Sequence, residues 1–170
     1  QKDISRKLFD SATEANKEIA NKVYSEPSLE GMGCTYILST IIKDKFFWCS
    51  IGDSPIWLYR NGKIKQINED HSMKPILEKM HRDGELTNEQ LVSDPRRNSL
   101  RSCLYGDTIE LIDHPQDPII LKKDDIIILA SDGVETLSII EMEVIITKNK
   151  KENPDKIVKN ILEKIKNKNI

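Results

Sequence analysis

The sequence has little cysteine, few aromatic residues and no long apolar run. Three cysteines among 170 residues lack the CxxC spacing of a zinc site, and their odd number does not fit a disulfide framework. No apolar stretch approaches the ~20 residues that a membrane span needs, and no signal-peptide pattern opens the chain. The glycine-rich signatures of nucleotide sites are absent as well. We therefore expect a cytoplasmic protein with no membrane partner.

Charge is plentiful but balanced, with 26 Lys and Arg against 28 Asp and Glu and a net charge of −2. Such a balance gives no basic field for nucleic acid, which we do not expect as a partner. Lysines gather in residues 148–168, but they alternate there with Ile, Val and Leu at helical spacing. A solvated helix face explains them better than an anion-binding patch. The length predicts one domain, residues 1–170, that buries roughly two-thirds of its unfolded surface.

The first half of the chain predicts one helix followed by strands. Apolar residues recur every three or four positions from Ile4 to Val23, which predicts an amphipathic helix over residues 3–23. Four strands with short turns are predicted next, at residues 36–42, 46–51, 56–60 and 63–67. Asn61-Gly62 separates the last two, and Asn-Gly between apolar runs is the strongest short hairpin signal. We expect an antiparallel meander, which argues against a doubly wound parallel sheet.

The second half of the chain predicts helices and strands in turn. Residues 73–99 predict short helices, one of them opened by a capping box at Thr87. Strands are predicted at residues 108–112, 119–121 and 125–130. Ser138 begins a second capping box, and Asn153 caps a last helix with Pro154 at its first position. Helices packed on antiparallel sheet make this an α+β chain.

Asp132 follows the apolar run 126–130 and precedes a glycine. A buried strand that ends in this way presents the carboxylate at the rim of its sheet, where it can bind a hard cation. Mg²⁺ and Mn²⁺ prefer carboxylate and water ligands, and they neutralise phosphate oxygens and activate water. A plain turn stays open as an alternative, because Asp-Gly is a common turn dipeptide. A phosphoacceptor Asp would need alternating strands and helices, which the meander excludes.

Asp53 lies in a second turn-like segment, residues 52–55. It either caps backbone N–H groups of a tight turn or provides a second acidic group near Asp132. The neighbours Asp70 and His71 could form a charge relay. Because this pair follows a strand and has acidic neighbours, we expect His71 to be a hydrogen-bonded structural histidine instead.

Three arginines, Arg96, Arg97 and Arg101, gather around Asn98 in a polar stretch. One interpretation is a solvated cluster without a ligand. The other is a rim that attracts phosphorylated segments, since guanidinium geometry matches phosphate. Both interpretations remain open at the level of the sequence.

Several segments in a fixed order resemble the PPM (type 2C) family of metal-dependent serine/threonine protein phosphatases. They are residues 31–35 (Gly-Met-Gly-Cys-Thr), 51–63 (beginning Ile-Gly-Asp-Ser), 69–72 (Glu-Asp-His-Ser), 97–106 (beginning Arg-Asn-Ser-Leu) and 129–133 (Leu-Ala-Ser-Asp-Gly). Motifs that keep their order over most of the chain make this resemblance specific. It implies a sandwich of two antiparallel β-sheets flanked by α-helices, with a flap at about residues 74–96.

The resemblance also implies a reaction, the hydrolysis of phosphoserine or phosphothreonine in proteins by water held between two Mn²⁺ or Mg²⁺ ions. Asp132 would bind one ion directly, Asp53 would serve a weaker third ion, and Arg97 would bind substrate. The family often places an acidic partner for the third ion four residues after the position of Asp132, where this chain has Thr136. The implied partner is a phosphorylated protein, and the expected state is a monomer.

Two motifs of the family have no match in the sequence. One is an Asp-Gly motif near the start that bridges both metals, and the other is an Asp-Asn motif on a final strand. We expect these 170 residues to be part of a longer enzyme and to be inactive alone. The alternative is a phosphatase-like binding or regulatory module that performs no catalysis.

Overall fold

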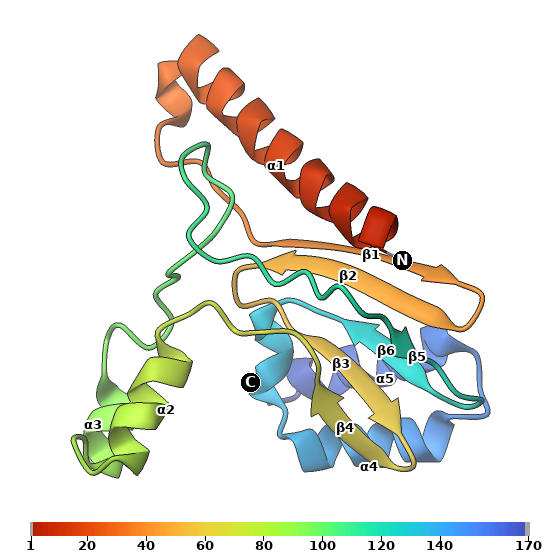
Figure 1. Ribbon diagram of the computed structural model, residues 1–170. Coiled ribbons are helices and arrows are strands. Elements are labelled where there is room, and N and C mark those ends of the chain that lie inside the picture. Colours follow the sequence, from red (N-terminus) through yellow and green to blue (C-terminus); the bar gives the residue numbers. More distant parts are fainter. Residues whose placement is uncertain (1, 169–170) are drawn as a thin grey trace. The chain divides into compact units, whose positions relative to one another are not determined.

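The computed structural model describes residues 2–168, which fall into two compact units. Unit 1 contains the chain up to Ser54 together with Glu69–Ile120, and unit 2 contains Pro55–Asn68 together with the chain from Leu121 onward. Each unit holds one three-stranded antiparallel sheet and several helices (Figure 1). The two antiparallel sheets with helices confirm the predicted α+β class. The prediction of a single domain stays a prediction.

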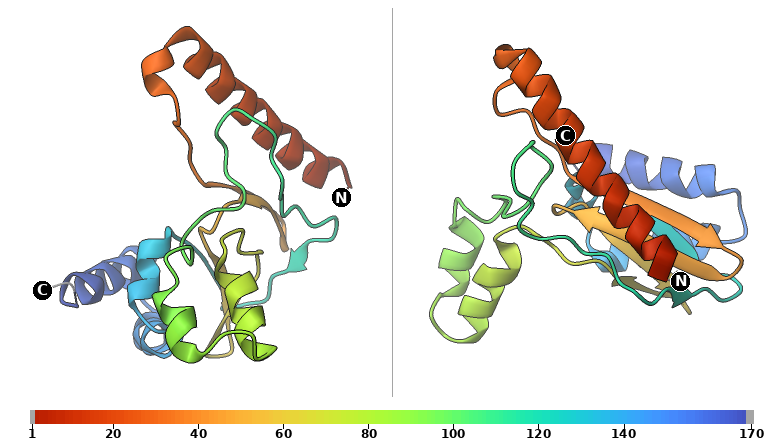
Figure 2. Two further views of the ribbon diagram at one scale, coloured as in Figure 1. Left: turned by 90° about the vertical axis from the view of Figure 1, so that its left-hand side faces the viewer. Right: turned by 45° about the horizontal axis from the view of Figure 1, so that its top comes forward.

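Unit 1 is built on a long helix and a hairpin. The helix α1 (Lys2–Ser25) packs on the hairpin of β1 (Tyr36–Ile42) and β2 (Lys45–Ile51), and this arrangement is visible from several sides (Figures 1 and 2). The short strand β5 (Ile119–Ile120) pairs with β2, which gives the strand order β1-β2-β5. One buried apolar cluster of this unit contains Leu8, Ala12, Phe47, Cys49, Ile51 and Leu104. None of the described helices is both long enough and apolar enough to cross a membrane.

Three short helices complete unit 1. The 3₁₀ helix η1 (Pro27–Leu29) follows α1, and α2 (Lys74–Arg82) and α3 (Asn88–Ser93) contact each other within the segment predicted as a flap (Figure 2). The predicted capping box at Thr87 is confirmed. The Gln90 N–H donates to Thr87 Oγ1 at 3.1 Å, and the Thr87 N–H donates to Gln90 Oε1 at 2.8 Å.

Unit 2 contains the second sheet, in which β3 (Ile56–Arg60) lies between β4 (Lys63–Gln66) and β6 (Ile126–Leu129). Asn61 and Gly62 join β3 to β4 with φ angles of 52° and 82°. A type I′ turn requires both central residues at positive φ, so the predicted hairpin is confirmed.

Helices pack on this sheet to form the core of unit 2. The 3₁₀ helix η2 (Asp132–Thr136) leads into α4 (Ile139–Asn149), and α5 (Pro154–Lys166) follows. One buried apolar cluster contains Trp57, Tyr59, Val134, Leu137, Met142, Ile146, Ile157 and Ile161. The predicted caps are present, because Ser138 Oγ accepts from the backbone of α4 and Asn153 Oδ1 accepts from the backbone of α5.

The predicted four-stranded meander is wrong. The strands β2 and β3 are adjacent in the sequence but belong to different sheets, so the residues between them mark a change of sheet. Strands from later in the chain take the edges that a meander would have used. β5 pairs with β2, and β6 pairs with β3.

The strand predicted at residues 108–112 is also wrong. Ile109 and Ile112 pack against the core of unit 1, which explains the apolar pattern. The backbone of this segment, however, is paired with a side chain rather than with a strand. Ser102 Oγ donates to the Leu111 carbonyl at 2.9 Å and accepts from the Leu111 N–H at 3.1 Å.

An ion pair joins Arg60 of β3 to Asp125, the residue before β6, and we predict that it stabilises the fold. Arg60 donates to both carboxylate oxygens of Asp125 at 2.9 and 2.6 Å, and the Asp125 side chain is only 4% exposed. These hydrogen bonds hold the pKa of Asp125 below its usual range. Asp125→Ala removes the partner of a half-buried guanidinium and should lower the urea midpoint clearly at pH 7.

The control is Asp10→Ala, which breaks the exposed ion pair with Arg6 and should change the midpoint little. A lowered carboxylate pKa stabilises the fold above the unfolded value of about 3.9 and loses this effect as the pH falls. The difference between wild type and Asp125→Ala should therefore shrink between pH 7 and pH 3. Equal effects of the two substitutions at pH 7 would contradict the assignment.

Candidate functional site

Four of the segments that resemble the phosphatase family meet in unit 1. Cys34 and Leu104 exchange both backbone hydrogen bonds, at 2.8 and 2.9 Å. The Arg101 N–H donates to the His71 carbonyl at 2.8 Å, and the His71 N–H donates to the Gly52 carbonyl at 3.1 Å. Segments 31–35, 69–72 and 97–106 are thereby brought to the turn that carries Asp53.

Gly52 shapes this turn and cannot easily be replaced. Its φ of +102° lies in the left-handed region, and a Cβ added to it would lie 2.5 Å from Thr35 Cγ2. Thr35 also shares a hydrogen bond of 2.9 Å between its hydroxyl and that of Ser54. Thr35 thus packs on Gly52, the residue before Asp53, and forms a hydrogen bond with Ser54, the residue after it. Asp53 itself is half-buried.

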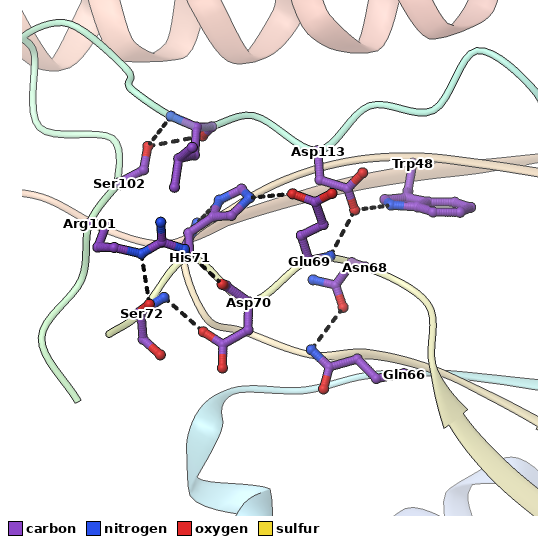
Figure 3. Close-up of polar contacts among 12 residues, drawn as sticks. Trp48, Gln66, Asn68, Glu69, Asp70, His71, Ser72, Arg101, Ser102 and Asp113 are labelled. Atoms are coloured by element: carbon purple, nitrogen blue, oxygen red, sulfur yellow. Dashed lines mark hydrogen bonds and ion pairs between the residues drawn. The ribbon is translucent and has the colours of Figure 1, made fainter. Parts of the chain in front are cut away.

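His71 contacts the same turn through its ring. The imidazole is 1% exposed, and its Nδ1 accepts from the Gly52 N–H at 3.2 Å. Nδ1 is therefore unprotonated and Nε2 carries the hydrogen, which makes the ring neutral. Nε2 has no hydrogen-bond partner among the described residues, and Glu69 Oε2 lies 3.9 Å away (Figure 3). The prediction that His71 is hydrogen-bonded is confirmed, and its structural role stays a prediction.

The lowered pKa of His71 predicts that the stability of the fold depends on pH. Burial lowers this pKa, and the charge of Arg101 acts in the same direction against Glu69, Asp113 and Asp70, which raise it. The unfolded histidine takes up a proton below about pH 6.5, whereas the folded ring resists protonation. The unfolded state then binds more protons, so the free energy of unfolding should fall as the pH decreases through this range.

The measurement is the urea midpoint at pH 7.5 and pH 5.5 for wild type and for His71→Asn, which keeps an acceptor and does not titrate. We expect a smaller loss on acidification in His71→Asn. His81→Asn is the matched control, because His81 is only half-buried and lies in α2. A wild-type pH dependence that survives in His71→Asn would rule out His71 as its source.

Asp113 forms hydrogen bonds with several distant residues, which the sequence did not predict. Its Oδ2 accepts from Trp48 Nε1–H at 2.9 Å and from the Glu69 N–H at 3.0 Å (Figure 3). Its backbone also pairs with that of Ser50. It therefore ties β2 to the segment that carries His71. A single acid after the apolar pair Leu111 and Ile112 was the signal that could have drawn attention to it.

The three arginines have different surroundings. Arg96 forms a two-point ion pair with Asp94 and holds the pKa of that carboxyl at about 2. Arg101 donates from Nε to the Ser72 carbonyl at 2.8 Å (Figure 3). Arg97 instead has a buried Nε without a hydrogen-bond partner among the described residues. Arg96 and Arg101 thus form hydrogen bonds with other residues of the chain, and Arg97 differs from them in its unpaired Nε among the described residues.

Asp132 is the first residue of η2, and its side chain is exposed. The strand β6 ends at Leu129, so the carboxylate follows the strand after a short connection rather than ending it directly. Thr136 Oγ1 donates to the Gly133 carbonyl at 2.9 Å, and this bond closes the turn. Asp132 thus belongs to unit 2, and Asp53 belongs to unit 1.

The acidic residues do not form a complete metal centre within the part of the chain that the structure describes. Within residues 2–168, no group of three or more His, Cys, Asp and Glu side chains is placed to hold a metal ion. The described residues by themselves therefore do not fit a two-ion centre, which needs several oxygen ligands.

Comparison with known proteins gives concordant findings. A family model described as Protein phosphatase 2C matches residues 1–81. The serine/threonine phosphatase Stp of Listeria welshimeri is 31% identical over 124 residues, covering 73% of this chain and 47% of that protein. The solved serine/threonine phosphatase of S. agalactiae has a TM-score of 0.78 at 23% identity, over 95% of this chain and 63% of that chain. The solved catalytic domain of the serine/threonine phosphatase PstP, in complex with 2 manganese ions, has a TM-score of 0.66 at 23% identity. The match covers 90% of this chain and 60% of that chain.

These structures define the class, because the described chain has the fold of PPM serine/threonine phosphatases. The sequence matches agree with the fold, and the chain belongs to the PPM (protein phosphatase 2C) family. It spans about half the length of the curated relatives that it matches.

Proposed function

We propose that the whole protein is a metal-dependent serine/threonine protein phosphatase that acts on phosphorylated proteins as a cytoplasmic monomer. The observation that carries this proposal is the meeting of four separated family segments at the turn of Asp53. Asp132 supplies a second, exposed carboxylate in a segment that also resembles the family. The sequence similarity to Stp supports the same conclusion.

The proposed cofactor is a pair of Mn²⁺ or Mg²⁺ ions, as the manganese complex of PstP supports. When bound, such ions neutralise phosphate oxygens and lower the pKa of a water ligand toward neutrality. Asp132 would contribute a direct ligand, Asp53 an additional acidic group, and Arg97 a contact to the substrate phosphate. Since the described residues do not complete a centre, we expect residues 1–170 alone to release no phosphate.

The test is phosphate release from a phosphothreonine peptide by the full-length protein with Mn²⁺, with Mg²⁺ and with a chelator. We expect turnover with either metal and none after chelation. A full-length protein that binds the peptide without hydrolysing it would instead be the phosphatase-like binding module. Turnover that persists with the chelator would remove the metal from the proposal.

A further inference from the structure

The helix α5 has an apolar face that is wider than the part of it that packs in unit 2. Ile157 and Ile161 are 6% and 7% exposed within the buried cluster of this unit. Val158 and Leu162 follow them by one position each and form a second apolar stripe, but they are 54% and 52% exposed. A helix that packs along one stripe carries polar residues on its other faces. The second stripe therefore indicates a contact that the described residues do not supply.

The strand β6 lies at an edge of its sheet, since the strand order is β4-β3-β6. The Ala130 N–H donates to the Pro55 carbonyl, so the alternation of antiparallel hydrogen bonds turns the backbone groups of Ile127 and Leu129 away from β3, toward the open edge. The Leu129 side chain is 48% exposed, and β6 contains no charged residue. Native proteins normally cover, charge or shorten an apolar edge of this kind, because it pairs readily with another strand.

A groove of about 460 Å³ lies between β6 and α5, entirely within unit 2. Apolar side chains from both elements line it, namely Ile128, Leu129, Val158, Ile161, Leu162 and Ile165. A second hollow of about 290 Å³ shares four of these residues and continues along β6 to Ile126. We call the two together the β6–α5 groove. An apolar floor beside open strand backbone fits an extended apolar segment, which would add a strand to the sheet.

Solved relatives contain additional chain that could provide such a segment. The match to the S. agalactiae phosphatase covers 95% of this chain but 63% of that chain, and the match to the M. tuberculosis phosphatase PstP covers 90% and 62%. More than a third of each relative thus lies outside the matched part. A typical strand needs only about five or six residues. A segment tethered in the same polypeptide has a high effective concentration at the groove and fills it before another molecule does.

We propose that an extended apolar segment of the same polypeptide, from outside residues 1–170, fills the β6–α5 groove in the whole protein and pairs with β6 as a further strand. Its backbone forms hydrogen bonds with Ile127 and Leu129, and its side chains pack against Val158 and Leu162. The inference concerns the assembly of the fold and does not depend on phosphate release.

The first experiment compares the urea midpoints of the full-length wild type, Val158→Lys and Leu162→Lys. At half exposure a lysine would extend into water and change little. In a filled groove the same lysine meets apolar side chains, and each variant should lower the midpoint by about 1 M. The matched control is Ile140→Lys in α4 of the same unit, where the side chain is 72% exposed. It should stay within about 0.2 M of wild type.

The second experiment is hydrogen exchange of the full-length wild type, which gives a result even if the lysine variants do not fold. The Ile126 and Ile128 amides point toward β3 and serve as internal references. With a further strand in place, the Ile127 and Leu129 amides should exchange as slowly as these two. At an open edge they should exchange at least about 100-fold faster.

Each alternative result overturns the proposal in a recognisable way. Unchanged midpoints in both lysine variants, or fast exchange at Ile127 and Leu129, would show that the groove is open in the whole protein. Slow exchange together with a doubled mass by light scattering would assign the groove to a second copy instead. A wild type that shows slow exchange as a monomer but releases no phosphate would contradict the proposed function alone.

Discussion

Asp132→Asn is expected to slow metal-dependent phosphate release by the full-length protein roughly 100- to 1,000-fold while leaving its thermal stability close to wild type. The side chain is exposed at the start of η2, and Asn serves a turn at this position as well as Asp does. Folding should therefore change little. If Asp132 binds a metal ion as proposed, its loss removes several kcal/mol of charge stabilisation by the metal, which corresponds to roughly 100- to 1,000-fold in rate.

The matched control is Glu135→Gln, which neutralises another exposed acid in the same 3₁₀ helix and should retain most of the rate. Rate and melting temperature should be measured on the same preparations at saturating Mn²⁺. Normal folding with an unchanged rate in Asp132→Asn would remove Asp132 from the metal site. The plain turn would then be the correct interpretation of the Asp-Gly pair.

Gly52→Ala is expected to destabilise the fold strongly. The new Cβ would lie 2.5 Å from Thr35 Cγ2 and 2.9 Å from Thr35 Cβ, and the backbone would keep a φ of +102°. Overpacking and a left-handed backbone together should lower the free energy of unfolding by about 3 kcal/mol. Urea denaturation at pH 7 measures this change.

Gly62→Ala separates the two causes, because Gly62 has a φ of +82° but no atom within 4 Å of an added Cβ. It should cost only about 1 kcal/mol, the backbone part of the effect. The double variant Thr35→Ser with Gly52→Ala removes the methyl group in closest contact and should recover part of the loss. Failure of the double variant to recover any stability would show that the contact with Thr35 is not the cause.

The sequence predicted the features whose causes lie within a few residues. Asn61-Gly62 predicted its hairpin because both residues tolerate positive φ, whatever the rest of the chain does. The capping boxes at Thr87 and Ser138 were predictable for the same reason, since each closes over three residues. His71 was predicted as a structural histidine from its neighbours, although its partner Gly52 was not.

The features that the sequence did not predict depend on distant partners. β2 and β3 are separated only by a turn, yet each takes a partner from the later part of the chain. No local sequence pattern predicts these pairing partners, because both strands are apolar and could equally have paired with one another. Asp113 was missed for a similar reason, since its contacts to Trp48 and Glu69 exist only in the folded chain. The contact between Thr35 and Gly52 likewise depends on the tertiary structure.

The division of each unit into two separated stretches of chain has a consequence for synthesis. In unit 1, α1, β1 and β2 are contiguous, so most of that sheet can pack as soon as it is made. In unit 2, the β3–β4 hairpin must wait for β6 and the last two helices, and chains grow by roughly 5–20 residues per second. We therefore expect Trp57 and Tyr59, both only 2% exposed in the finished fold, to be exposed to solvent for several seconds during synthesis. We expect this hairpin to be the segment that chaperones bind on the ribosome, and protease sensitivity of stalled nascent chains would reveal it.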